Sequence, residues 1–128
     1  MIPLKKTLQL KSIKNKQKNL EKIVIPCCKA YEIHKIQDIL RCEARQNYCR
    51  IFLKNGSMLT STSPLGHYKE LLQNSGFLSC HRSHLVNLNH IQKYYKEGSV
   101  ELSDNSTVPV SRRMKENFLN QVMDHFYS

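Results

Sequence analysis

The chain has 128 residues, enough for one domain with a modest core but not for two sizeable ones. Twenty Lys and Arg against ten Asp and Glu give a net charge of +10, which predicts a polyanionic partner, first nucleic acid and second an anionic membrane surface. No apolar run approaches membrane-spanning length, and five Cys without CxxC spacing indicate free thiols in a reducing cytoplasm.

The basic charge is concentrated at the start of the chain. Residues 1–23 hold seven Lys against Glu21 alone, a local net charge of +6, and this stretch has no apolar core of a signal peptide. We predict a basic linker or tail over residues 1–22 and a folded domain over residues 23–128. Such a tail can bind phosphates without sequence preference or serve only as a solvated connection.

Short strands are predicted from Glu21 onward, in the runs IVIPCC, YEIHKI and DILRCEA. The next segment, NYCRIFLKNGSMLTST, predicts a hairpin with Tyr48, Arg50 and Phe52 on one face and Cys49, Ile51 and Leu53 on the other. Its Asn55-Gly56 pair is typical of a primed two-residue turn.

A helix is predicted next, in SPLGHYKELLQNSG, with Ser63 as N-cap, Pro64 as first helical residue and Gly76 as the end. The stretch FLSCHRSHLVNLNHI then alternates like one half-buried strand, with four contact-forming side chains facing outward: Cys80, Arg82, His84 and Asn87. Two more short runs, HIQKYY and SVELSDNSTVPV, predict another hairpin. Ser111 can cap a final helix with Phe118, Leu119 and Val122 on its packed face.

Enzyme motifs are absent: the chain has no glycine-rich phosphate loop, no GxSxG and no HExxH, and it has only four Gly. We therefore expect no enzyme and no cofactor. A zinc site is a candidate because Cys80, His81 and His84 lie close in sequence. On one strand, residues 81 and 84 point to opposite faces, which argues against a metal site.

Nucleic-acid binding fits the polar residues better, but not through a recognition helix, since neither predicted helix carries a row of base-reading side chains. The candidates lie at strand ends and turns. Arg can donate two hydrogen bonds to guanine, and Asn can pair with adenine, although each Arg can instead hold a phosphate. His81 and Ser83 suit local hydrogen bonds, while Cys42 and Cys49 suit small buried positions.

The stretch from about Leu20 to Val122 resembles a LytTR-type DNA-binding domain, the output module of many bacterial response regulators. The resemblance rests on three segments in the family's order and spacing: DILRCEARQNYCRIFLKNG, FLSCHRSHLVNLNHI and VPVSRRMKENFL. It implies a mainly β fold, an elongated stack of small antiparallel sheets with one internal helix and a C-terminal helix. Loops, rather than a helix, would then enter the major groove.

The resemblance also implies roles for individual residues. Base contacts are expected from Asn47, Cys49, Arg82 and Arg112. Contacts to the DNA backbone, or support of the loops, are expected from Arg45, His81, Ser83, Arg113 and Lys115. Because a thiol is a poor hydrogen-bonding group, Cys49 can be limited to apolar contact while Asn47 or Arg45 does the reading.

The expected partner is double-stranded DNA, with no membrane, and the expected function is that of a transcriptional regulator or of the output domain of a two-component system. A second copy on paired or repeated sites and an upstream receiver domain or sensor kinase are further expectations from the resemblance. The alternative is an anionic-surface or protein-interaction module whose basic tail provides the binding. A thiol-based redox sensor is a third hypothesis and requires an exposed Cys of low pKa.

Overall fold

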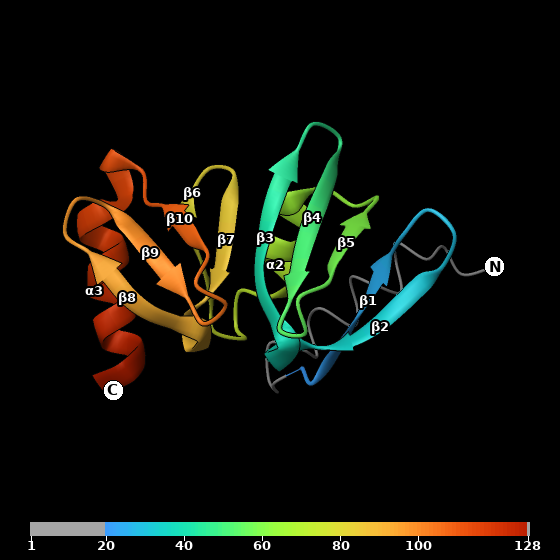
Figure 1. Ribbon diagram of the computed structural model, residues 1–128, viewed down its shortest axis with the longest axis horizontal. Helices are drawn as coiled ribbons and strands as arrows, with labels where there is room; N and C mark the ends of the chain where they lie inside the picture. The colour runs from blue at the N-terminus through green and yellow to red at the C-terminus, as the bar shows by residue number, and fades with distance from the viewer. Residues whose placement is uncertain (1–19, 128) are drawn as a thin grey trace.

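Alternating apolar residues organise the chain into three antiparallel sheets, with a helix beneath one of them and a second helix at the C-terminal end (Figure 1). The structure is a computed structural model and describes residues 20–127. The predicted mainly β, elongated stack of small sheets is confirmed. No helix within the described residues is long and apolar enough to cross a membrane.

The central sheet has five strands in the order β5-β4-β3-β7-β6. Its middle strands are covered on both faces, because Cys42 and Leu85 belong to one buried cluster while Leu40 and Val86 belong to the other. Two-sided burial explains why these strands have adjacent apolar residues. The strands are β3 (Ile39–Arg45), β4 (Tyr48–Leu53), β5 (Met58–Ser61), β6 (Phe77–His81) and β7 (His84–Asn87).

A separate hairpin precedes this sheet and consists of β1 (Lys22–Pro26) and β2 (Tyr31–Lys35). Ile23 and Ile25 point into the first cluster and are almost fully buried. The predicted tail of residues 1–22 falls mostly outside the described residues. Where the two overlap, Leu20 packs against the core and β1 begins at Lys22, so the folded part starts before residue 23.

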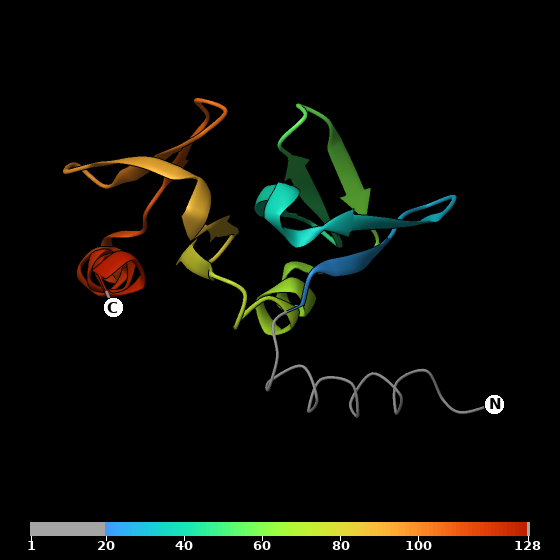
Figure 2. The same ribbon diagram turned by 90° about the horizontal axis from the view of Figure 1, so that it is seen from below.

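The third sheet has the order β10-β9-β8 and packs with helix α3. Phe118 on α3 is buried, and its ring stacks on Tyr94 with 6.2 Å between ring centroids. Figure 2 shows α3 beside this sheet at the opposite end of the molecule from the β1–β2 hairpin. The elements are β8 (Ile91–Tyr95), β9 (Ser99–Leu102), β10 (Thr107–Pro109), the 3-10 turn η3 (Arg112–Met114) and α3 (Lys115–Tyr127).

The internal helix α2 spans Leu65–Leu71, and two further 3-10 turns, η1 (Ile36–Asp38) and η2 (Leu88–His90), lead into β3 and β8. The predicted capping of α2 was wrong, because Pro64 is the N-cap and no side chain caps the helix. The Ser63 N–H donates instead to Ser61 Oγ at 3.1 Å, and Ser61 Oγ also lies 2.6 Å from the Tyr68 hydroxyl.

The turn between β4 and β5 also differs from the prediction. The Leu53 N–H donates to the Ser57 carbonyl at 2.9 Å, and the Gly56 N–H donates back to the Leu53 carbonyl at 3.0 Å. The loop therefore has three residues, not two, and Gly56 takes the left-handed position with φ +93°. The Asn55 side chain stabilises this loop by accepting from the Ser57 N–H at 2.9 Å.

The stretch expected to form one strand is a hairpin, because β6 and β7 pair in antiparallel fashion on either side of the Arg82–Ser83 turn. Two of its four expected outward residues are consequently buried, since Cys80 is 0% exposed and Asn87 is 2% exposed. The Asn87 amide donates to the Ile39 carbonyl at 2.9 Å, and its oxygen accepts from the Asn89 N–H at 3.0 Å. Burial of this amide is thus matched by hydrogen bonds.

Candidate nucleic-acid interface

Three loops lie along one edge of the molecule, the upper edge in Figure 1: the β3–β4 turn, the β6–β7 turn and η3. Backbone hydrogen bonds between neighbouring segments hold them in place. The Ala44 N–H at the end of β3 donates to the Ser83 carbonyl at 2.9 Å, and the Ser111 N–H before η3 donates to the Cys80 carbonyl at 2.8 Å. The three loops are therefore fixed relative to one another by the sheet backbone.

The β3–β4 turn carries the first group of candidates. Arg45 pairs with Tyr48 across the hairpin, which leaves Gln46 and Asn47 as a two-residue loop. Gln46 adopts a left-handed conformation with φ +51°. Arg45, Gln46 and Asn47 are all exposed, so a guanidinium and two amides are available at this tip.

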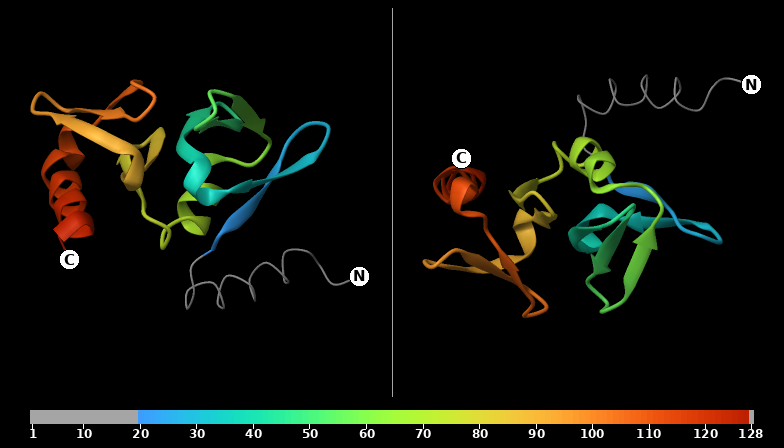
Figure 3. Two further views of the ribbon diagram at one scale, coloured as in Figure 1. Left: turned by 60° about the horizontal axis from the view of Figure 1, so that its bottom comes forward. Right: turned by 90° about the horizontal axis from the view of Figure 1, so that it is seen from above.

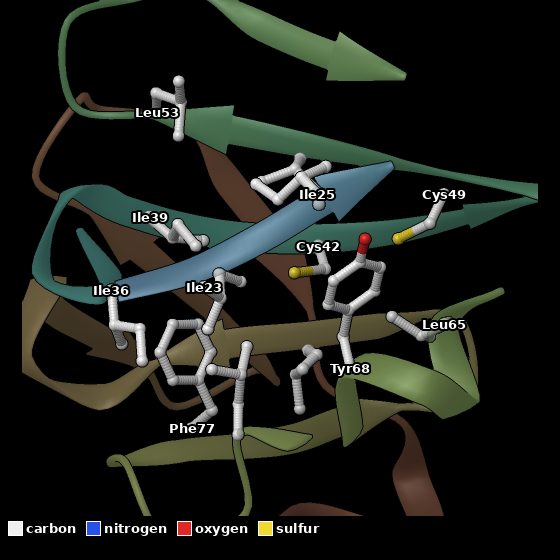
Figure 4. Close-up of a cluster of buried hydrophobic side chains, with 13 residues drawn as sticks. Ile23, Ile25, Ile36, Ile39, Cys42, Cys49, Leu53, Leu65, Tyr68 and Phe77 are labelled. Atoms are coloured by element: carbon white, nitrogen blue, oxygen red, sulfur yellow. The ribbon is translucent and has the colours of Figure 1, made fainter. Parts of the chain in front are cut away.

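Cys49 does not join them, which corrects the expected base contact. It is 0% exposed and lies with Ile51 in the first buried cluster, where Figure 4 shows its sulfur directed inward near Tyr68. A side chain in that position has no path to a base. The alternation of β4 already contained this information, because it places Cys49 on the same face as Ile51 and Leu53.

The β6–β7 turn presents Arg82, which is exposed. The Ser83 N–H donates to Nδ1 of His81 at 3.1 Å, so this imidazole closes the turn. Lys69 on α2 lies below, and its Nζ donates to the Arg82 carbonyl at 3.5 Å. The Lys69 contact could not be predicted from the sequence, because it depends on how α2 packs under the sheet.

His81 and His84 face each other across this hairpin, with ring centroids 5.3 Å apart. The argument that they point to opposite faces was therefore wrong, since it assumed one continuous strand. Burial lowers the pKa of His84, and the nearby His81 and Arg41 lower it further while Glu43 acts in the opposite direction. Within residues 20–127, no group of three His, Cys, Asp or Glu side chains is placed to hold a metal ion.

The third loop begins at η3, where Arg112 and Arg113 are exposed. The Met114 N–H donates to the Ser111 carbonyl at 3.0 Å and closes this turn. Lys115 starts α3, and its Nζ donates to the Glu97 carbonyl at 3.4 Å. Its aliphatic carbons lie 3.4 Å from where a Cβ on Gly98 would stand, so Lys115 also holds the β8–β9 turn against the helix.

The electrostatic balance at this edge is basic. The described residues retain a net charge of +4, because six of the twenty Lys and Arg lie in residues 1–19, which contain no acidic residue. Within residues 20–127, neither the His34–Glu32 contact on β2 nor the Lys54–Asp38 ion pair at the opposite edge involves an arginine of the three loops. The loops thus offer uncompensated positive charge to a polyanion.

Two of the three buried thiols, those of Cys42 and Cys80, do not match a redox sensor. Burial raises the pKa of Cys80 to about 12. The pKa of Cys42 is also raised, by its hydrogen bond with Cys49 and by burial. A thiol that stays protonated and has no solvent access reacts slowly with oxidants.

Comparison with known families decides the identity of the domain. The model of the LytTr DNA-binding domain matches residues 29–123. The chain belongs to this family. The LytTR fold is also seen in a solved structure described as the LytTr DNA-binding domain of a response regulator from Bacillus cereus. The two share 20% sequence identity with a TM-score of 0.70, over 82% of this chain and 98% of that one. Comparison with curated proteins finds no match.

Proposed function

We propose that this LytTR chain binds specific sequences of double-stranded DNA as a transcriptional regulator or as the output domain of a two-component response regulator. The three loops along the upper edge read bases in the major groove. One observation carries the proposal: separate segments with exposed Arg and Asn side chains are held side by side by the Ala44–Ser83 and Cys80–Ser111 backbone hydrogen bonds. Because the chain belongs to a DNA-binding family, DNA is the proposed partner.

The loop residues divide by chemistry and exposure. Asn47, Arg82 and Arg112 are the proposed base readers, since an amide or guanidinium on a protruding tip can form paired hydrogen bonds with base edges. Arg45 and Arg113 are exposed beside them and suit phosphate contacts.

The remaining candidates act through the loops. His81 and the Ser83 backbone fix the conformation that presents Arg82. Lys115 combines a charge with support of the β8–β9 turn.

The decisive experiment is selection of duplexes from a random pool at near-physiological salt, with the intact chain and with Arg82→Ala and Arg112→Ala. We expect an enriched motif for the intact chain and loss of preference at particular base positions for each variant. A lost bidentate contact should cost about 1–3 kcal/mol of discrimination. Lys115→Ala should weaken binding more evenly across sequences, because it removes a charge that carries no base information.

Lys54→Ala is the matched control. Lys54 is exposed in the β4–β5 turn at the opposite edge, and its ion pair with Asp38 spans 3.5 Å at the surface. Its removal should leave the motif unchanged and reduce affinity little. Binding that follows net charge alone, with no enriched motif for the intact chain, would instead favour the interaction-module alternative.

A further inference from the structure

Strand β2 has an open hydrogen-bonding edge. Among the described residues its only strand neighbour is β1. The Ile36 N–H donates to the Glu21 carbonyl at 2.9 Å and the Cys27 N–H donates to the Ala30 carbonyl at 2.8 Å, one at each end of the hairpin. Because bonding groups alternate along an antiparallel strand, the N–H and C=O groups of Tyr31, Ile33 and Lys35 point away from β1.

The same three residues lie on an exposed face of the hairpin. Tyr31 is 75% exposed and Ile33 is 64% exposed, and Ile33 pairs across the hairpin with Val24, itself 49% exposed. In both views of Figure 3 this hairpin lies at the opposite end of the molecule from α3. An exposed apolar edge strand is a template for pairing with another strand.

Several other sheet edges within residues 20–127 carry features that discourage pairing, and β2 shares one of them, the exposed Lys35. The outer edge of β5 bridges the residue after β1 at Ser61, and the edge of β6 accepts a hydrogen bond from Ser111. Strand β10 contains Pro109, and β8 exposes Lys93. Proline and lysine both discourage edge pairing. The edge of β2 differs from these edges in combining open backbone groups with two strongly exposed side chains that carry apolar surface, Tyr31 and Ile33.

The sequence of β2, YEIHK, is complementary to itself when read in the antiparallel direction. Centred on Ile33, the register places Ile33 against Ile33 of a second copy, Glu32 against His34, and Tyr31 against Lys35. Each pair joins an apolar residue to an apolar residue, an acid to a base, or an aromatic ring to a cation, all of which stabilise cross-strand contacts. A one-residue slip would lose these pairings.

We propose that two copies of this chain associate through antiparallel pairing of their β2 edges, which joins the two hairpins into one four-stranded sheet. The contact is isologous, so it closes after two copies and does not propagate. It lies on the hairpin at the end of the molecule, away from the three loops, and therefore leaves them accessible (Figure 1). The contact goes beyond the proposed reading of DNA and does not depend on it.

The association should be weak, because the interface is small and the two copies carry charge of the same sign. One five-residue strand pair and an apolar row of Val24 and Ile33 bury far less than the roughly 1,200 Å² of a stable complex. Each copy also carries a net charge of +10, which repels the other. Added salt screens this repulsion and should strengthen pairing, whereas it weakens DNA binding.

The test is sedimentation equilibrium of the full chain without DNA, over a range of protein concentrations and at two salt concentrations. We expect a monomer–dimer equilibrium that shifts toward dimer as salt is raised. Ile33→Lys places like charges opposite each other and removes the central apolar pair, so it should raise the dissociation constant roughly tenfold. Because Ile33 is exposed, the melting temperature of the Ile33→Lys variant should stay close to that of the parent chain.

Two further samples test whether the contact is at β2 and whether residue 33 pairs with itself. Met123→Lys adds the same charge at another exposed apolar residue, Met123 on α3, which is 49% exposed against 64% for Ile33, and should leave the equilibrium unchanged, apart from the added repulsion. A mixture of Ile33→Lys and Ile33→Glu should restore dimers, because residue 33 faces itself across the two-fold axis. A chain that is monomeric at every concentration overturns the proposal. So does an equal loss in Met123→Lys, or a mixture that fails to dimerise.

Failure here is distinguishable from failure of the proposed function. The selection experiment relies on Arg82 and Arg112 and reports an enriched motif, whereas this experiment contains no DNA. A monomeric chain that still enriches a motif would remove the dimer and leave the DNA proposal intact.

Discussion

At the scale of single residues, Asn47 and Cys49 lie two positions apart in one hairpin but in opposite environments. Cys49 is 0% exposed and Asn47 is exposed at the tip. Cys49→Ser should therefore lower the free energy of unfolding by about 1–3 kcal/mol, because it buries a more polar hydroxyl. Asn47→Ala should leave stability nearly unchanged and blur a base position. Denaturant unfolding and duplex selection on both variants separate the effects; a blurred motif in Cys49→Ser at full stability would contradict this assignment.

His84 makes stability depend on pH. Burial is the main cause of its lowered pKa, so the folded state favours the neutral imidazole. The unfolded chain therefore binds more protons below about pH 6.5, and stability should fall as the pH drops through that value toward the folded pKa. The melting temperature should be lower at pH 5.5 than at pH 7.5, and His84→Gln should reduce the difference. An unchanged pH difference in the variant would exclude His84 as a source.

At the scale of elements, Phe118 is the buried residue of helix α3. Phe118 is 1% exposed in the second cluster and stacks on Tyr94 of β8. Phe118→Ala should cost about 3–5 kcal/mol of unfolding free energy through lost burial and the cavity left behind. Met123→Ala on the same helix is the control, since Met123 is 49% exposed and should cost little. If calorimetry shows that both variants lose the same free energy of unfolding, α3 is not held by its buried face.

Elements that depend on local sequence pattern could be predicted from the sequence, whereas elements held by tertiary contacts could not. Strand β4 followed from alternation, because period two decides which face is buried. The β6–β7 hairpin did not follow, because the Arg82–Ser83 turn contains no Gly, Pro, Asn or Asp to mark it. That turn is held by the His81 imidazole and by the Ala44–Ser83 hydrogen bond, and the second of these joins residues far apart in sequence.

At the scale of the whole molecule, the exposure of single candidates such as Arg82 and Arg112 could be predicted from the sequence, but their common surface could not. Arg82 and Arg112 stood out as guanidinium groups near turns, and both are exposed. Their common edge with Asn47 arises from backbone bonds between β3 and β7 and between β6 and η3. No periodicity encodes those bonds, so the resemblance to a family was the only sequence-level guide to the surface.

The basic tail provides the last test at this scale. Deleting residues 1–19 removes six Lys and no acid, while Leu20, which packs on the core, stays. The plot of log affinity against log salt should become shallower, by up to about 5 if each Lys contacts a phosphate. The selected motif should persist, because its readers lie on the three loops. Fluorescence anisotropy on a selected and a scrambled duplex measures both. If the deletion abolishes the difference between the duplexes, the tail contributes to recognition, and the loops alone do not account for it.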